Sequence, residues 1–224
     1  MRSYVIHVRS ETDRLARFQA GFPACLGTCV VVPCVTVEDF DRVPDWWCWP
    51  KQYWAHTQSV LRTFRMAEQE GDDFLFFEDD AVFAEDFEAV YRQTMAAVPE
   101  NWNQIYFGGL HCHDGLYPPC QVNEHILRGR YINWNHCFAV HRNTVSRLIA
   151  WLEKPFWESP HCVDHRLNQL HLQPDYYAYA PLHFVVGQAA GKSTMNGVVK
   201  TEDCYCNGFS YLGLDGKRHT EGMK

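Results

Sequence analysis

Short apolar runs alternate along this chain with longer stretches in which apolar residues recur every three or four positions. The short runs predict strands, at residues 4–8, 29–35, 74–77, 104–110, 136–140 and 175–188. The longer stretches predict helices, at residues 10–21, 51–71, 84–98, 143–152 and 165–172. Continuous apolar strands joined through helices are typical of parallel sheets. The pattern therefore predicts an α/β fold with a mostly parallel central sheet flanked by helices.

The segments between these elements lack a clear period. Residues from 111 to the strand at 136 are rich in loop signals, and residues 44–50, PDWWCWP, are expected to form a loop that packs as an aromatic plug or lines a pocket. From residue 187 onward the chain is Gly-rich and polar, which predicts a flexible lid or tail over residues 187–224. No repeat or second domain is evident, so residues 1–224 are expected to form a single domain.

Composition and charge narrow the class of protein. The 224 residues are 46% hydrophobic and 15% aromatic, as in a globular protein with a cleft. The formal net charge of −7 speaks against nucleic acid as the main partner, although a basic strip at Arg128, Arg130 and Arg142 keeps that partner open. Because no apolar run approaches the ~20 residues that span a bilayer and no signal peptide is evident, we expect a cytoplasmic protein without a transmembrane segment.

Ten cysteines are more than such a chain needs. Without an export signal most are expected to be reduced, and several lie in apolar runs where they would be buried. No CxxC pair occurs, but the looser pairs Cys25/Cys29 and Cys204/Cys206, together with HCHD at 111–114, leave a structural zinc site open.

The most informative stretch is FLFFEDDAVF, residues 74–83, in which an apolar strand runs into Glu78, Asp79 and Asp80. Ligands bind beyond the carboxyl ends of strands in parallel α/β sheets. Adjacent carboxylates repel one another unless a positive charge is near, and an all-oxygen site favours Mg²⁺ or Mn²⁺. The alternative is that one of these carboxylates only caps the following helix.

Four segments in order resemble glycosyltransferase family 25, the lipopolysaccharide and procollagen galactosyltransferases. They are YVIHVRSETDRLARF at 4–18, AHTQSVLRTFRMAEQEGDDFLFFEDDAVF at 55–83, NHCFAVHRNTVSRLI at 135–149 and HCVDHRLNQL at 161–170. The resemblance implies a single GT-A (Rossmann-like) domain, a UDP-sugar donor and a divalent metal, Mn²⁺ or Mg²⁺. In that scheme the metal neutralises the diphosphate leaving group.

The resemblance also assigns roles on the donor side. Asp80 would be the main metal ligand, with Glu78 and His183 as further candidates. The donor would contact Val8, Arg9, Arg14, His56, Glu78, Asp79, Gln188 and Lys192. Three of these candidates also have a structural interpretation: Arg14 suits a solvated helix face, whereas His56 and His183 suit core positions.

On the acceptor side, the family-like motif HCVDHRLNQL places Asp164 just before a predicted helix. Inversion by direct displacement needs a base to take the proton of the acceptor hydroxyl, and Asp164 is the candidate. An N-cap role for Asp164 is the alternative, and His165 or Asp175 would then be the next bases to consider.

The sequence thus predicts a metal-dependent inverting glycosyltransferase that moves a hexose from a UDP-sugar to a hydroxyl of a glycan, lipopolysaccharide-like or protein-linked acceptor. Two alternatives stay open. One is a non-catalytic binding module of the same fold with a Cys/His zinc site. The other is a glycosyltransferase that acts on modified nucleobases in DNA.

Overall fold

The computed structural model describes residues 1–155, 162–195 and 197–221. Its centre is a ten-stranded sheet with the strand order β14-β13-β6-β7-β9-β5-β8-β3-β1-β2. The strands are β1 (Arg2–His7), β2 (Cys29–Pro33), β3 (Phe74–Glu78), β5 (Gln104–His111), β6 (Cys120–Asn123), β7 (Ile126–Gly129), β8 (Ile132–Val140), β9 (Ala178–Pro181), β13 (Phe209–Leu212) and β14 (Arg218–Glu221). Two small sheets pair β4 (Ala81–Phe83) with β10 (Val186–Gln188) and β11 (Gly191–Lys192) with β12 (Val199–Lys200).

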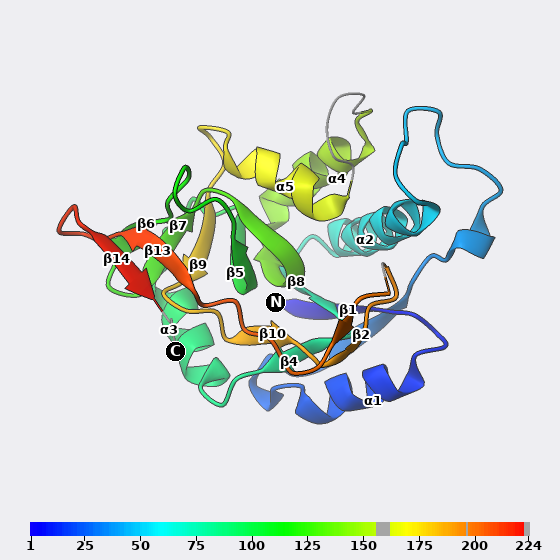
Figure 1. Ribbon diagram of the computed structural model, residues 1–224, viewed down its shortest axis with the longest axis horizontal. Coiled ribbons are helices and arrows are strands. Elements are labelled where there is room, and N and C mark those ends of the chain that lie inside the picture. The colour runs from blue at the N-terminus through cyan, green and yellow to red at the C-terminus, as the bar shows by residue number, and fades with distance from the viewer. Residues whose placement is uncertain (156–161, 196, 222–224) are drawn as a thin grey trace.

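Helices cover both faces of the large sheet (Figure 1). On one face lie α2 (Lys51–Glu70), α4 (Val145–Glu153) and α5 (Val163–His171), and on the other lie α1 (Thr12–Gly21) and α3 (Phe87–Ala97). Short 3₁₀ segments occur at η1 (Ala24–Leu26), η2 (Val37–Asp39) and η3 (Arg142–Thr144). The predicted alternation of strands and helices is confirmed, and α2 ends at Gly71, whose φ of 74° lies in the left-handed region that favours glycine.

The side-chain alternation of the strands builds two cores. In β3, Phe74 and Phe76 belong to the core under α2, α4 and α5, whereas Leu75 and Phe77 belong to the core on the side of α1 and α3. All four side chains are at most 1% exposed. Burial on both faces explains why this strand reads as a continuous apolar run.

The sheet is mixed, which corrects the mostly parallel sheet predicted from the sequence. β1 runs parallel to β2 and β3, but β8 runs antiparallel to both β3 and β5. The reason is the connection: the β6–β7 hairpin, and no crossover helix, separates β5 from β8. The chain therefore re-enters the sheet where it left it, with Ile132 opposite His111.

Two segments without a clear period also hold strands. The loop-rich segment after residue 111 contains the antiparallel pair β6–β7, and the predicted lid or tail contains β11 to β14. β13 and β14 extend the large sheet beyond β6. Such short strands, of two to four residues, give too few positions for a period-2 pattern to stand out.

The cysteines are all free thiols. Cys137 and Cys162 are buried, Cys48 is exposed, and the other seven are partly buried, so fewer are fully buried than the apolar runs predicted. No helix among the described residues is long and apolar enough to cross a membrane.

Candidate active site

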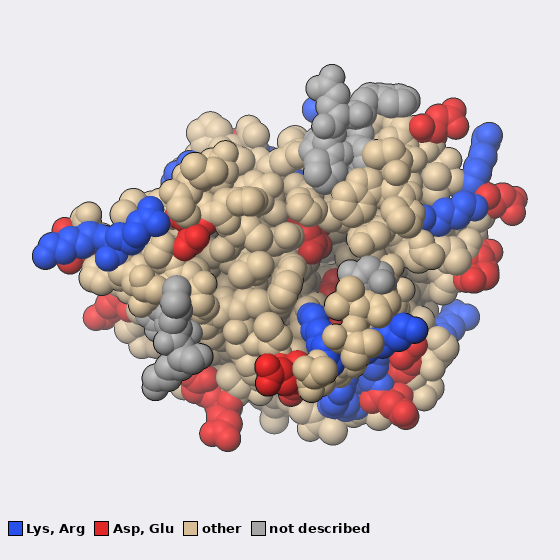
Figure 2. All heavy atoms as spheres, viewed as in Figure 1, with Lys and Arg blue, Asp and Glu red and all other residues tan. Residues whose placement is uncertain are grey.

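Glu78, Asp79 and Asp80 lie at the carboxyl end of β3, as the sequence predicted, but their side chains reach different partners. Figure 2 shows acidic side chains inside a hollow near the middle of one face, with basic side chains gathered beside it. The strand delivers Glu78 to the face that carries α2, and the next two residues turn toward α1 and the small β4–β10 sheet.

Glu78 pairs with His56, whose Nε2 lies 3.0 Å from Glu78 Oε1. Burial alone would raise the pKa of Glu78, but the hydrogen bond and charge of His56 outweigh it and the pKa is lowered. Burial would lower the pKa of His56, but Glu78 outweighs it and the pKa is raised. The two groups therefore favour each other's charged forms, and the fold brings His56 into contact with the acidic run.

Asp79 is the most enclosed of the three carboxylates, at 5% exposure. His7 Nδ1, at the end of β1, lies 2.8 Å from Asp79 Oδ2, and Arg14 Nη2, on α1, lies 2.9 Å from Asp79 Oδ1. Burial raises the pKa of Asp79, and Arg14 and His7 oppose the rise. These contacts tie β1, β3 and α1 together at the carboxyl edge of the sheet.

Among the described residues, the charged partner in contact with Asp80 is Arg14, whose Nη2 lies 3.2 Å from Asp80 Oδ2. Its Oδ1 is buried and has no hydrogen-bond partner within the described part of the chain. Burial, and next the charge of Glu78, raises the pKa of Asp80 to about 7. Its backbone carbonyl accepts a 2.7 Å bond from the Ala189 N–H, which fixes the turn against the late segment. Asp80 is thus the carboxylate with unused ligand capacity.

Basic side chains of the protein therefore offset much of the repulsion between the three carboxylates, for which a metal ion was predicted. Arg14 is 17% exposed in its side chain and bridges Asp79 and Asp80, so it does not lie on a solvated helix face. The described residues include no group of three or more His, Cys, Asp or Glu side chains that could hold a metal ion. A cation at Asp80 would need further ligands from a bound substrate, which is usual for Mg²⁺.

Asp164 lies in the first turn of α5. Asn135 Nδ2, from β8, donates to Asp164 Oδ1 at 3.1 Å. Burial, and next the charge of Glu78, raises the pKa of Asp164 to about 6, while His56 opposes the rise. The charges of Glu78 and His56 act on Asp164, so the fold brings this residue toward the acidic run although about 85 positions separate them in the sequence.

The strand beneath Asp164 has an unusual backbone. Trp134 has φ of 61°, and among the described non-glycine residues only His113 shares a positive φ. A backbone hydrogen bond from Trp134 helps to lower the pKa of Asp164, and the Trp134 ring lies 4.7 Å from Lys200 Nζ. A non-glycine residue with positive φ costs free energy, and such residues concentrate at functional sites. The backbone of β8 at Trp134 is therefore a candidate part of the active site.

The two lysines of the late segment lie in different surroundings. Lys192 in β11 is exposed, whereas Lys200 in β12 donates to the side chain of Gln188, and its charge acts on the pKa of Asp80. Gln188 pairs with Ala81 across β4–β10, which places it beside the acidic turn.

The other residues predicted for the site have partners of their own, and not all of them contact the acidic run. Val8 and Arg9 follow the carboxyl end of β1, and Arg9 is exposed. His183 Nε2 lies 3.0 Å from Asp86 Oδ2, and no contact joins His183 to the acidic run in the described structure. Asp175 is 70% exposed in its side chain and pairs with Arg147, so it does not join Asp164. His165 neighbours Asp164 on α5 and is partly buried.

Sequence reasoning missed four residues of the site: His7, Trp134, Asn135 and Lys200. His7 ends an apolar strand, and an ionisable residue at that position was an available signal. Asn135 opens the family-like segment at 135–149 but received no role there, and Trp134 and Lys200 carry no motif.

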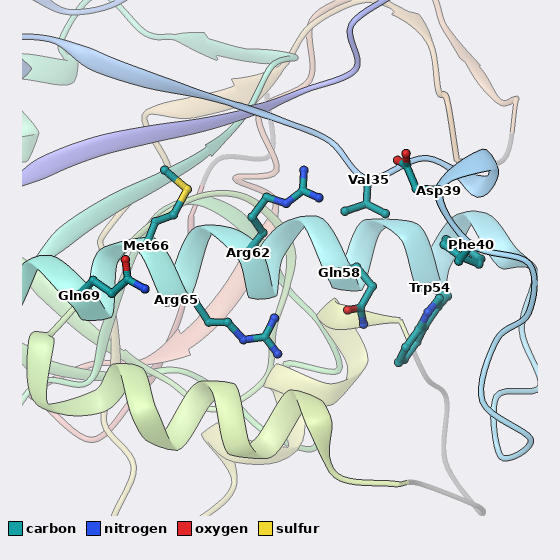
Figure 3. A pocket seen from close by; sticks show the side chains of 9 residues that line it. All are labelled: Val35, Asp39, Phe40, Trp54, Gln58, Arg62, Arg65, Met66 and Gln69. Atoms are coloured by element: carbon teal, nitrogen blue, oxygen red, sulfur yellow. The ribbon is translucent and has the colours of Figure 1, made fainter.

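A separate groove of about 470 Å³ runs along the outer side of α2 (Figure 3). Its lining includes Trp54, Gln58, Arg62 and Arg65 from α2 and Phe40 from the loop after η2. None of the carboxylates of the acidic run lines it, and we treat it as distinct from the candidate active site.

Comparison with known proteins gives only distant likenesses. No protein-family model matches the chain, and no curated protein matches it. Among solved structures, a glycosyltransferase involved in the glycosylation of the major capsid of PBCV-1 aligns at a TM-score of 0.48 with 11% identity, over 82% of this chain and 83% of that one. A197 from STIV aligns at 0.43 with 11% identity, over 100% and 96% of the two chains. UDP-glucose pyrophosphorylase complexed with UDP-glucose aligns at 0.43 with 9% identity, over 80% and 72%. These similarities are too weak to carry an argument about function.

Proposed function

We propose that this chain is a GT-A glycosyltransferase that moves a hexose from a UDP-sugar to an acceptor hydroxyl with inversion. One observation carries the proposal: the fold brings Asp164, a carboxylate with a raised pKa, toward the acidic turn in which Asp80 keeps an unpartnered buried oxygen. A base on one side and a free ligand oxygen on the other are what displacement at a diphosphate-linked carbon requires.

Asp80 would hold the divalent cation, Mn²⁺ or Mg²⁺, together with oxygens of the donor diphosphate. Its unpartnered Oδ1 fits this role, because buried oxygens without partners are rare and costly. When bound, the cation neutralises the charge that develops on the diphosphate as it leaves. Glu78 remains a candidate ligand through the oxygen that His56 does not engage.

The donor would lie across the carboxyl ends of β1 and β3. Val8 and Arg9 follow β1 directly and would line the nucleotide pocket. Lys200 and Gln188 reach the acidic turn from the late segment, so Lys200 replaces Lys192 as the proposed cation for the diphosphate. Arg14 holds Asp79 and Asp80 in place.

Asp164 is the proposed base. The acceptor oxygen forms a bond to the anomeric carbon, the bond from that carbon to the diphosphate oxygen breaks, and the hydroxyl proton passes to the Asp164 carboxylate. A pKa of about 6 leaves the group largely ionised at neutral pH and still able to take a proton. Asn135 orients the carboxylate through its 3.1 Å hydrogen bond.

A panel of nucleotide sugars tests this proposal. UDP with Mn²⁺ should raise the melting temperature of the protein, and one UDP-hexose should be hydrolysed slowly without acceptor. The control is ADP with Mn²⁺, which shares the diphosphate but has a different base. If no uridine nucleotide stabilises the protein in the presence of Mn²⁺ or Mg²⁺, the proposed function is wrong.

The two alternatives gain no support from the site. A Cys/His zinc centre needs at least three clustered ligands, and the described residues provide no such group. Cys204 and Cys206 approach each other to 3.7 Å as a pair only. A nucleobase acceptor in DNA would need a basic path to the site, and Arg128 instead packs over the ring of Tyr177.

A further inference from the structure

The loop of residues 44–50 divides its tryptophans between two roles. Trp47 is 6% exposed, and its ring centroid lies 5.0 Å from that of Trp54 on α2. Trp46 packs on the same ring at 5.7 Å. These two side chains fasten the loop to the helix. Trp49 turns elsewhere: it packs edge to face against Tyr53 at 4.9 Å and stays partly exposed.

Trp49 and Tyr53 lie close to residues that adjoin the candidate active site in sequence or on the same helix. The Trp49 ring centroid lies 6.3 Å from that of His165, the neighbour of Asp164 on α5. Tyr53 precedes His56 by three positions on α2, so the two side chains share a helix face, and His56 holds Glu78. The two rings therefore form a wall where the first turns of α2 and α5 meet.

A polar group of β8 complements this aromatic wall. Asn135 is 2% exposed, and its Oδ1 has no hydrogen-bond partner within the described part of the chain. Its Nδ2 donates to Asp164, so the unpartnered oxygen lies beside the proposed base. A buried amide oxygen without a partner costs free energy, and a ligand hydroxyl would remove that cost.

We propose that Trp49, Tyr53 and Asn135 form an acceptor subsite for a pyranose ring of a glycan. This inference rests on the proposed function and adds the class of acceptor. A pyranose has an apolar face of C–H groups and an edge of hydroxyls. The face packs on an aromatic ring, whose negative π-cloud attracts the C–H groups, and the edge bonds to the amide and carboxylate. A peptide hydroxyl offers no such face.

Saturation-transfer NMR on the full chain tests the subsite directly. The probes are methyl β-D-galactopyranoside and methyl β-D-glucopyranoside, and the comparison compound is a capped tripeptide with a central serine. We expect saturation of the pyranosides, strongest at the axial protons of one ring face, and none of the tripeptide. Trp49→Ala should weaken pyranoside binding about tenfold. The control Trp54→Phe changes a neighbouring ring that belongs to the loop anchor, and it should keep the signal.

Several outcomes would overturn the subsite: no saturation of either pyranoside, stronger saturation of the tripeptide, or equal signals from the wild type and a folded Trp49→Ala variant. The distribution of saturation over the sugar ring is measured on the wild type, so it decides the matter even if the variant does not fold. Calorimetry with UDP and Mn²⁺ is read separately. Loss of UDP binding with a retained pyranoside signal would refute the proposed function and leave a carbohydrate-binding site.

Discussion

Replacing Asp164 by Asn separates the chemical role of this residue from its structural role. Asn has nearly the same shape, and its Oδ1 can still accept the hydrogen bond that Asn135 Nδ2 donates at 3.1 Å. The variant loses only the negative charge and the ability to take a proton. The N-cap of α5 is Cys162, so the alternative role of Asp164 as N-cap is wrong. If Asp164 were only a structural residue of the first helical turn, the change would cost little in activity.

The pKa of Asp164 fixes the sign of the effect on stability. Burial and the charge of Glu78 raise this pKa from 3.8 to about 6. The folded protein therefore keeps a proton that the unfolded chain releases, and the free energy of unfolding falls as the pH rises through this window. The difference between the two pKa values corresponds to at most about 3 kcal/mol. Asp164→Asn should thus be as stable as the wild type or more stable at neutral pH.

Activity should move in the opposite direction. Loss of a general base lowers kcat by about 10²–10⁴, whereas UDP-sugar affinity should stay near the wild-type value. In the wild type, kcat should fall on the acid side with an apparent pKa of about 6, because protonated Asp164 cannot act as a base. The residual kcat of the variant should not show this fall at acid pH.

The assay follows transfer of the hexose at several pH values, with proton NMR of the product. Inversion gives a product with the anomeric configuration opposite to that of the donor. A variant with near-normal kcat would refute the base role of Asp164 and direct attention to His165. A product with the configuration of the donor would rule out direct displacement.

Three further changes test the remaining parts of the site. Asp80→Asn should abolish Mn²⁺-dependent UDP binding by calorimetry and leave the fold intact; unchanged affinity would remove Asp80 from the metal site. Lys200→Met should weaken UDP binding about tenfold, since its charge reaches Asp80, whereas the exposed Lys217→Met should not change it. Arg14→Met should lower the free energy of unfolding by about 3 kcal/mol, because it leaves Asp79 and Asp80 without their shared cation. Arg17→Met, on the same helix, should cost much less in the same denaturant titration, and equal losses would contradict the role of Arg14.

The elements that could be predicted are those with a strong local signal. The apolar run at Phe74–Glu78 and the long amphipathic helix at Lys51–Glu70 were recognisable because burial imposes a period on many consecutive positions. The position of the acidic turn at the carboxyl end of a strand followed from the same pattern. The antiparallel direction of β8 did not, because it depends on where the chain re-enters the sheet.

The candidate site shows the same division. Asp80 and Asp164 carried a local motif, whereas Trp134 and Lys200 come close to the acidic turn only through strand pairing. The charge balance of the acidic run also escaped prediction. The sequence shows that three carboxylates need a positive partner, but it cannot show that Arg14, more than 60 positions away, supplies part of it.

The antiparallel insertion of β8 between β3 and β5 has a consequence for synthesis on the ribosome. β3 and β5 are both synthesised before residues 132–140 emerge, and both pair with β8 along most of their length. Until then, the apolar segments FLFF and QIYF each present an edge with unpaired backbone groups, which is a template for association with other chains. A nascent chain stalled before residue 132 should therefore be prone to aggregate and dependent on chaperones. Strand β8 covers these two edges and also carries Asn135, which contacts Asp164. The strand that protects the nascent chain from association is therefore the strand that completes the candidate site.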